Sequence, residues 1–234
     1  MTLLALSCTV ESFEKITVKD WMSETVYSPL IIAIMLKIFR QFEGISTILS
    51  FASRILTQAD FRGANSTEIV VAVIQVVSSL LSCLLIDRLN RRSLFIFTCL
   101  LMGISLAALG CSFYFLHLPK SLTLIAMCVY ILCFATGVGP LTYLLPTELL
   151  PTRVRGAASA IAIEINYLSA FVVVNLYTKM ESKLHSYGCF WIYAVVCLIS
   201  AIFVYYAIPE TKGKTLEEIE EWFMEKSTKR NNLK

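Results

Sequence analysis

The chain contains six long runs of apolar residues separated by shorter polar connections. The runs cover residues 29–51, 69–86, 93–116, 122–145, 157–177 and 187–208. A helix that crosses the hydrocarbon core of a bilayer needs about 20 predominantly apolar residues, and each run comes close to this length. Because lipid offers the backbone no hydrogen-bond partners, such runs are expected to be helical. The pattern therefore predicts an all-α membrane protein with six transmembrane helices.

The segments on either side of this bundle are more polar. We expect residues 1–28 to form a cytoplasmic lead-in, residues 29–208 the transmembrane bundle and residues 209–234 a cytoplasmic tail. Within the tail, residues 215–226 carry apolar side chains at spacings of three and four. This spacing predicts a short amphipathic helix.

Basic residues are distributed unevenly over the connections. Of the 20 lysines and arginines, thirteen fall on the side that holds both ends of the bundle, five on the opposite side and two within the first span. Because cytoplasmic loops carry an excess of basic residues, both termini are predicted to be cytoplasmic, in a multi-pass protein of the plasma membrane. The sequence Asn65-Ser66-Thr67 is an acceptor pattern for N-glycosylation and falls on the predicted outer side.

The composition excludes several other classes of protein. Hydrophobic residues make up 57% and charged residues 16% of the chain, whereas soluble domains have about 45–50% and about 25%. A net charge of +3 is too small for a nucleic-acid-binding surface. Most of the eight cysteines lie in or beside apolar runs and are interpreted as small buried residues. No Cys or His cluster has metal-ligand spacing, so we expect no metal, no cofactor, no nucleic acid and no enzymatic activity.

Three motifs follow predicted helices on the cytoplasmic side. They are DRLNRR at 87–92, PTELLPTRVRG at 146–156 and PETKGKTLEEIE at 209–220. Together and in this order they resemble the C-terminal half of the sugar porter family, within the major facilitator superfamily, over roughly residues 27–223. The run LLIDRL at 84–89 is similar to facilitated trehalose and hexose transporters. The resemblance implies one six-helix half of a major facilitator fold and transport of a sugar by alternating access.

The same motifs place carboxylates beside basic residues at helix ends. Exposed ion pairs are individually weak, at about 0.2–1 kcal/mol, so a set of them can hold the cytoplasmic ends of helices together and still open reversibly. We therefore predict a cytoplasmic latch, with the alternative that the basic residues only set the topology. The residues predicted to form the latch are Asp87, Arg88, Arg91, Arg92, Glu148, Arg155 and Glu210.

The resemblance also implies which residues bind the substrate. The first-span pattern of the family, QQxSGxN, reads RQFEGIS at 40–46, so that Arg40 replaces a Gln and Ser46 replaces the Asn. In the fourth span the GPxPxW signature keeps a Gly and a Pro but has Tyr143 in place of Trp. In the second and fifth spans, a Gln and an Asn-Tyr pair stand for the Asn and the Asn-Trp of the family. The substrate-binding residues implied in this way are Gln41, Ser46, Gln75, Tyr143, Asn166 and Tyr167.

The first span carries charged residues that lipid does not tolerate. A charge at the bilayer centre costs about 2.5–3.5 kcal/mol, so the face that holds Lys37, Arg40 and Gly44 is expected to point into the protein. Arg40 and Glu43 are three positions apart and can neutralise each other. The alternative is an altered substrate site. Both alternatives remain open from the sequence.

Two further pairs of residues are judged by their angles on a helix. Gln41 and Ser46 lie about 140° apart on an unbroken helix, so they reach one cavity only if the helix breaks at Gly44. Glu164 lies about 200° from Asn166, so it is expected to contact a neighbouring helix instead.

Major facilitator transporters hold their substrate between two six-helix halves, and the resemblance covers one half. We therefore expect a fragment or half-transporter that pairs, within membrane lipid, with an N-terminal six-helix half or with another chain. Because two binding positions are altered, weak uptake of neutral sugars is predicted for this chain alone. The alternative function is a non-transporting membrane scaffold. The sequence leaves open which sugar is bound, whether protons are coupled and the oligomeric state.

Overall fold

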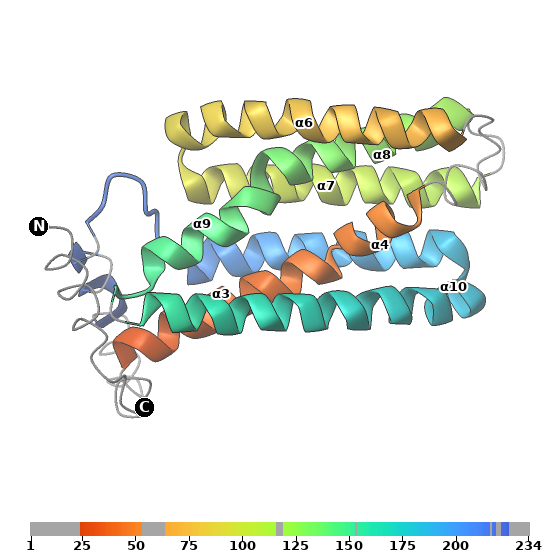
Figure 1. Cartoon of the computed structure of the whole chain (residues 1–234). Helices are drawn as coiled ribbons and strands as arrows, with labels where there is room; N and C mark the ends of the chain where they lie inside the picture. Colours follow the sequence, from red (N-terminus) through yellow and green to blue (C-terminus); the bar gives the residue numbers. More distant parts are fainter. Residues whose placement is uncertain are drawn as a thin grey trace, which may run out of the picture.

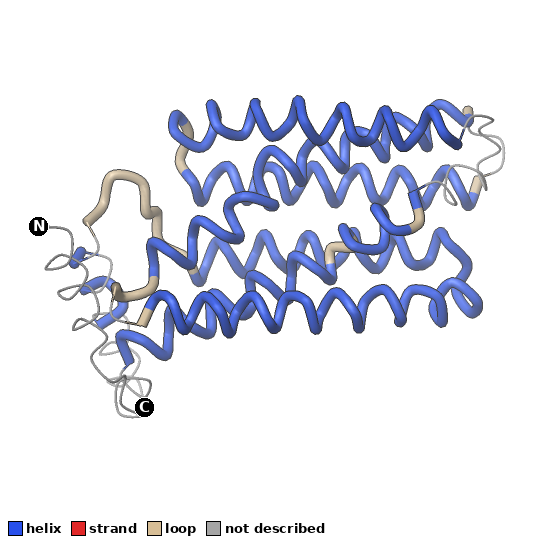
Figure 2. Tube along the Cα trace, in the orientation of Figure 1, coloured by secondary structure: helices blue, strands red, loops and turns tan. Residues whose placement is uncertain are grey.

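The computed structural model describes six ranges of the chain, which are 24–52, 64–115, 119–152, 154–215, 217–218 and 221–224. Every regular element in these ranges is helical (Figure 2). The helices run side by side in an elongated bundle (Figure 1). The prediction of an all-α protein is therefore confirmed for the part of the chain that the structure describes.

In chain order the described elements are α3 (Glu24–Phe42), α4 (Ile45–Ser50), α6 (Ala64–Arg88), α7 (Arg91–Tyr114), α8 (Lys120–Cys133), the π-helical turn η1 (Phe134–Val138), α9 (Gly139–Leu149) and α10 (Arg155–Ala207).

Four helical stretches are long and apolar enough to cross a membrane, judged over the described residues. The last of them, α10, has 53 residues, about twice what a bilayer requires. The helix is interrupted at His185, whose backbone has φ 59° and ψ 170°. Figure 1 shows that α10 reverses direction and that its two arms run back to the same end of the bundle. The fifth and sixth predicted spans are therefore the two arms of one hairpin. The four stretches are Val71–Arg88, Arg91–Tyr114, Ser121–Leu149 and Arg155–Ala207.

The first predicted span is broken into α3 and α4. Gly44 lies between them with φ 92°, a left-handed conformation that glycine adopts without steric cost. A Cβ at this position would lie 2.6 Å from the ring of Tyr193. Glycine is thus required at this break both by the backbone conformation and by the approach of α10. The six predicted spans are all present as helical segments, one of them broken and two joined in a hairpin.

The core lies between α7, α10 and the α3–α4 pair. Phe95, Met102 and Leu106 of α7 are fully buried, and Cys197 and Val204 of α10 face the same interior. By contrast, α6 lies at the margin of the bundle (Figure 1), and most of its apolar side chains are exposed. Lipid tails are as apolar as these side chains, so this exposure suits a membrane environment.

The part of the tail that the structure describes agrees with the predicted amphipathic helix. Residues 217–218 and 221–224 are helical. Phe223 is buried, and Trp222 packs against the same core. Residues 1–23 and 225–234 lie outside the described ranges, so the predicted domain boundaries stay predictions.

Candidate functional site

A polar network surrounds the break between α3 and α4. Arg40 Nη1 and Gln41 Nε2 both donate hydrogen bonds to Asn166 Oδ1, over 3.2 Å and 2.8 Å. Ser46 Oγ donates to Gln41 Oε1 over 2.5 Å. Gln41 and Asn166 are each only 2% exposed. With the break at Gly44, the side chains of Gln41 and Ser46 are in contact, although neither belongs to the lining of the neighbouring cavity; that both bind substrate stays a prediction.

A cavity of about 810 Å³ is formed by α3, α6, η1 and α9. Two of the predicted substrate-binding residues, Gln75 and Tyr143, line it. The network and the cavity share Arg40, which belongs to both. The hydrogen-bonding side chains of the lining are Arg40, Gln75, Ser79, Ser82, Asp87 and Tyr143.

Aromatic rings and basic groups meet at the wall of this cavity. The guanidinium carbon of Arg40 lies 5.2 Å from the ring centroid of Phe134 and 5.3 Å from that of Tyr143. Lys37 Nζ lies 2.9 Å from the centroid of Tyr143. The Lys37 side chain is only 2% exposed, and its Nζ has no hydrogen-bond partner among the described residues. Cation–π contacts are therefore the interactions that the protein offers to Lys37.

Of the two alternatives left open for Arg40 and Glu43, the ion pair is not formed in the described part of the chain. Glu43 is fully buried, and its Oε1 accepts a hydrogen bond from the Cys99 thiol over 3.5 Å. Its Oε2 has no partner in the described part of the chain. The packing of α7 and α10 takes the Glu43 side chain into the bundle core, whereas Arg40 points toward Asn166 and the cavity. Arg40 and Glu43 thus lie in separate surroundings, one at the cavity and one in the core.

Three potential metal ligands gather around Glu43. The ligand atoms of Glu43, Cys99 and Cys197 lie within 4.8 Å of one another. The Cys99 thiol also donates to the carbonyl oxygen of Cys197 over 3.1 Å. Linear spacing cannot reveal this cluster, because its members come from the α3–α4 junction, α7 and α10. Since hydrogen bonds engage the Cys99 thiol, we interpret the cluster as polar packing within the core.

Two residues of the fifth predicted span lie on the outer surface of this bundle. Tyr167 is 65% exposed, one position after the buried Asn166, so it belongs neither to the polar network nor to the cavity lining. Its role in substrate binding stays a prediction. Glu164 is exposed as well, which contradicts the expected contact with a neighbouring helix, because its face of α10 is not covered by the described helices. The sequon at Asn65 falls in the first turn of α6, and its glycosylation stays a prediction.

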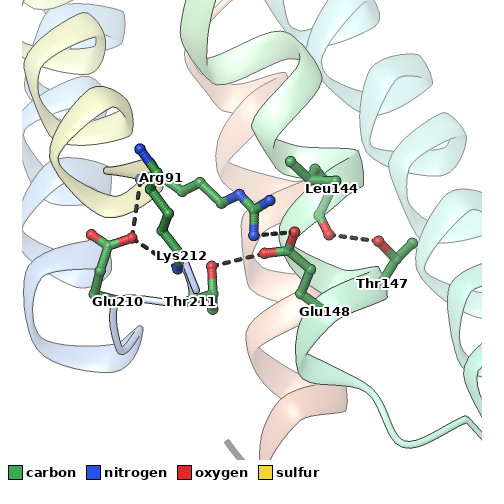
Figure 3. A network of polar contacts seen from close by, with 7 residues as sticks. All are labelled: Arg91, Leu144, Thr147, Glu148, Glu210, Thr211 and Lys212. Atoms are coloured by element: carbon green, nitrogen blue, oxygen red, sulfur yellow. Dashed lines mark hydrogen bonds and ion pairs between the residues drawn. The ribbon is translucent and has the colours of Figure 1, made fainter. Parts of the chain in front are cut away.

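A second polar network joins three helix ends (Figure 3). Arg91 of α7 forms an ion pair with Glu148 of α9. Glu148 Oε2 also accepts a hydrogen bond from Thr211 Oγ1 over 2.8 Å. The backbone N–H groups of Arg91 and Lys212 donate to Glu210 Oε1, over 3.1 Å and 3.3 Å. Two carboxylates thereby connect the start of α7, the end of α9 and the segment after α10.

The other basic residues at this end contact backbone carbonyl groups. Arg92 donates to the carbonyl oxygen of Tyr205, and its guanidinium carbon lies 4.7 Å from the ring of that residue. Arg155 Nε donates to Leu150 O over 3.2 Å, and Lys212 Nζ donates to Arg88 O over 2.5 Å. All three acceptors lie at helix C-termini, where carbonyl groups lack partners within the helix. Basic side chains are favourable at such ends. The sequence analysis considered only acid–base pairs and did not predict these contacts.

Sequence reasoning also missed part of the cavity. Asp87, predicted for the latch, lines the cavity instead. Ser78 and Ser82 are buried in α6, and their hydroxyl groups have no hydrogen-bond partner among the described residues. The available signal was the series of serines, at 78, 79 and 82, that interrupts the second apolar run. Arg40, for which both neutralisation by Glu43 and an altered substrate site were considered, lines the cavity.

Comparisons with known proteins agree on the origin of this arrangement. Residues 6–223 match the family described as "Sugar (and other) transporter". The chain is 32% identical over 217 residues to the mouse "Solute carrier family 2, facilitated glucose transporter member 8", covering 83% of this chain and 46% of that protein. It is 33% identical over 217 residues to the "Facilitated trehalose transporter Tret1" of Polypedilum vanderplanki, covering 88% of this chain and 42% of the relative.

Solved structures point in the same direction. An inward-open structure of the xylose transporter XylE from E. coli has a TM-score of 0.76 at 31% identity, covering 94% of this chain and 46% of XylE. Another structure, of the proton:xylose symporter XylE of the major facilitator superfamily bound to 6-bromo-6-deoxy-D-glucose, has a TM-score of 0.72 at 30% identity, covering 83% and 42%. The chain spans about half the length of the proteins that it matches. It is a multi-pass membrane protein with the fold of one major facilitator half, and it belongs to the sugar (and other) transporter family.

Proposed function

We propose that this bundle takes part in the transmembrane transport of a sugar, a hexose or a trehalose-like disaccharide, by alternating access. One observation carries the proposal, namely a buried network of Arg40, Gln41, Ser46 and Asn166 beside a cavity lined by Gln75. Amide and hydroxyl groups recognise sugar hydroxyls, and Tyr143 adds an aromatic surface. The named activities of the relatives support the same substrate class.

Alternating access requires a second bundle. We propose that residues 29–208 rock against another six-helix bundle, with the substrate between them, whether that bundle belongs to the same polypeptide or to another chain. The network of Arg91, Glu148 and Glu210 is proposed to close the cytoplasmic end, because ion pairs that are partly exposed to water open reversibly. The proposed chemistry is movement of a solute without catalysis of a bond change.

The proposed location is the plasma membrane, with both termini in the cytoplasm. Thr152 lies between α9 and α10, Ser182 lies near the reversal of α10, and both are exposed. Figure 1 shows these two segments at opposite ends of the bundle. In a background where the exposed Cys83 is replaced by Ser, we expect a Cys at position 182 to react with an impermeant maleimide from outside intact cells. A Cys at position 152 is expected to react only after permeabilisation. The reverse pattern would contradict the orientation.

Uptake of radiolabelled D-glucose and trehalose into proteoliposomes tests the transport function. When a second six-helix bundle is present in the same vesicles, we expect saturable uptake that Gln75→Ala lowers about tenfold, since loss of a polar partner in a binding site costs about 1–3 kcal/mol. Asn175→Ala is the matched control, because this exposed amide bonds only the backbone carbonyl of Phe171 among the described residues. Uptake that is equal in both variants would contradict the assigned site.

A non-transporting scaffold is the second candidate function. It is favoured by the substitutions at positions 40 and 46 in a chain whose Arg91–Glu148 ion pair is intact. The double variant Arg40→Gln with Ser46→Asn restores the residues of the family pattern. If the unmodified chain neither binds nor transports sugar and the double variant does, the scaffold function is supported.

A further inference from the structure

We propose that the cavity beside α3 binds a sugar that carries a carboxylate, of the uronate class, more tightly than the corresponding neutral sugar. This inference rests on the proposed function, and it names the substrate class of the same site. It follows from uncompensated positive charge at the cavity wall together with hydroxyl-binding groups across from it.

Arg40 carries a positive charge at the cavity wall. A guanidinium group stays protonated in proteins, and Arg40 lines the cavity. Its one hydrogen bond to a side chain goes to the neutral amide oxygen of Asn166. Its Nε is buried and has no partner within the described ranges. The rings of Phe134 and Tyr143 lie 5.2 Å and 5.3 Å from the guanidinium carbon, and the side chain is partly buried, so that an electrostatic interaction here is stronger than in bulk solvent.

Lys37 supplies a second basic group one helical turn earlier. Its Nζ lies against the ring of Tyr143, the same residue that Arg40 approaches. Neither cation forms an ion pair within the part of the chain that the structure describes. Two basic side chains of α3 therefore converge on one aromatic residue of the cavity wall.

The acidic groups nearby do not compensate this charge. The Glu43 carboxyl group lies in the bundle core, against the Cys99 thiol. Asp87 lines the same cavity, but no ion pair joins it to Arg40 in the described part of the chain. A neutral sugar would leave the partly buried charge of Arg40 without an opposite charge, which is costly in a low-dielectric site. An anionic ligand removes that cost on binding.

The donor geometry favours a carboxylate on a polyhydroxylated ring. Arginine binds carboxylates through parallel N–H groups, and the buried Nε of Arg40 provides one of them. Gln75 and Ser82 lie in the cavity lining contributed by α6, and the Ser82 hydroxyl has no partner there. These two groups are available to ring hydroxyls, which a simple anion lacks.

The test compares two ligands that differ at a single carbon. D-Glucuronate and D-glucose are titrated calorimetrically into the 234-residue chain in phosphatidylcholine nanodiscs, where no anionic lipid competes. We expect glucuronate to bind at least tenfold more tightly than glucose. Arg40→Gln should abolish this difference. Lys183→Gln removes one positive charge at an exposed position near the α10 reversal and should preserve the difference.

Two further measurements, at higher ionic strength and with acetate as competitor, help to separate the outcomes. Higher ionic strength should weaken glucuronate binding and leave glucose binding unchanged, a readout that needs no variant. Glucose binding that equals or exceeds glucuronate binding would overturn the carboxylate preference and leave the proposed sugar transport standing. Binding of neither ligand would overturn both proposals. Full displacement of glucuronate by an equal concentration of acetate would show a general anion site and would also overturn the proposed class.

Discussion

Two regions of this protein carry clustered charges, and they differ in how those charges are compensated. At the end of the bundle where α7 begins and α9 ends, Arg91 and Glu148 form an ion pair between residues that are 57 positions apart. In the middle of the bundle, Lys37, Arg40 and Glu43 fall within seven positions of one another, yet the described structure contains no ion pair among them. Closeness in sequence therefore does not decide which charges pair.

The two regions differ in the free energy that it costs to hold charged groups there. Partly exposed charges at helix ends are cheap to bring together and cheap to separate. Charges in the middle of a membrane are expensive to hold without a partner, so their presence there favours a ligand that compensates them. We infer that the end network serves closure of the bundle and the central charges serve binding.

Gly44→Ala should have the largest effect, because it removes the break that shapes the central region. A non-glycine residue at φ 92° is strained, and its Cβ would meet the Tyr193 ring at 2.6 Å. We expect a loss of about 2–4 kcal/mol in the free energy of unfolding, measured by thermal unfolding in detergent. Gly156→Ala is the matched control, since nothing lies within 4 Å of a Cβ there, and it should be neutral or slightly stabilising. Equal effects of the two changes would contradict the required break.

Removing one basic residue from each region should change stability in opposite directions. Lys37→Met eliminates a buried amino group that has no hydrogen-bond partner among the described residues. We expect the free energy of unfolding to rise by about 1–2 kcal/mol, with the loss of the cation–π contact already subtracted. Arg91→Met removes the ion-pair partner of the Glu148 carboxylate and should lower the free energy of unfolding by about 1 kcal/mol. Chemical unfolding of both variants in the same detergent provides the measurement. Destabilisation by both changes would remove the distinction between the two regions.

The smallest expected effect is the coupling of Arg91 with Glu148. Their side chains remain 23% and 18% exposed, so a double-mutant cycle with Arg91→Met and Glu148→Gln should give a coupling energy of about 0.5–1 kcal/mol. The coupling is expected to fall when the salt concentration is raised. A coupling energy of zero at low salt would indicate that the basic residues at this end only set the membrane topology.

Local patterns in the sequence were sufficient to predict the helices of the bundle. The six apolar runs predicted every helical segment of the described bundle, because apolar length is a property of about 20 consecutive residues. The break at Gly44 could be stated as a condition, since glycine alone adopts φ 92° without strain. The hairpin reversal at His185 could only be placed within a connection. The motifs at 87–92, 146–156 and 209–220 were sufficient to predict the family.

Only the tertiary structure decided which polar groups meet. Arg40 and Gln41 contact Asn166 across about 125 positions, while Glu43, a near neighbour of Arg40, contacts Cys99 of another helix. Helical angles predict which face a side chain occupies, but not which neighbouring helix covers that face. The packing of α7 and α10 against α3 settles that question, because it determines where each buried group finds a partner and where a positive charge is left for a ligand.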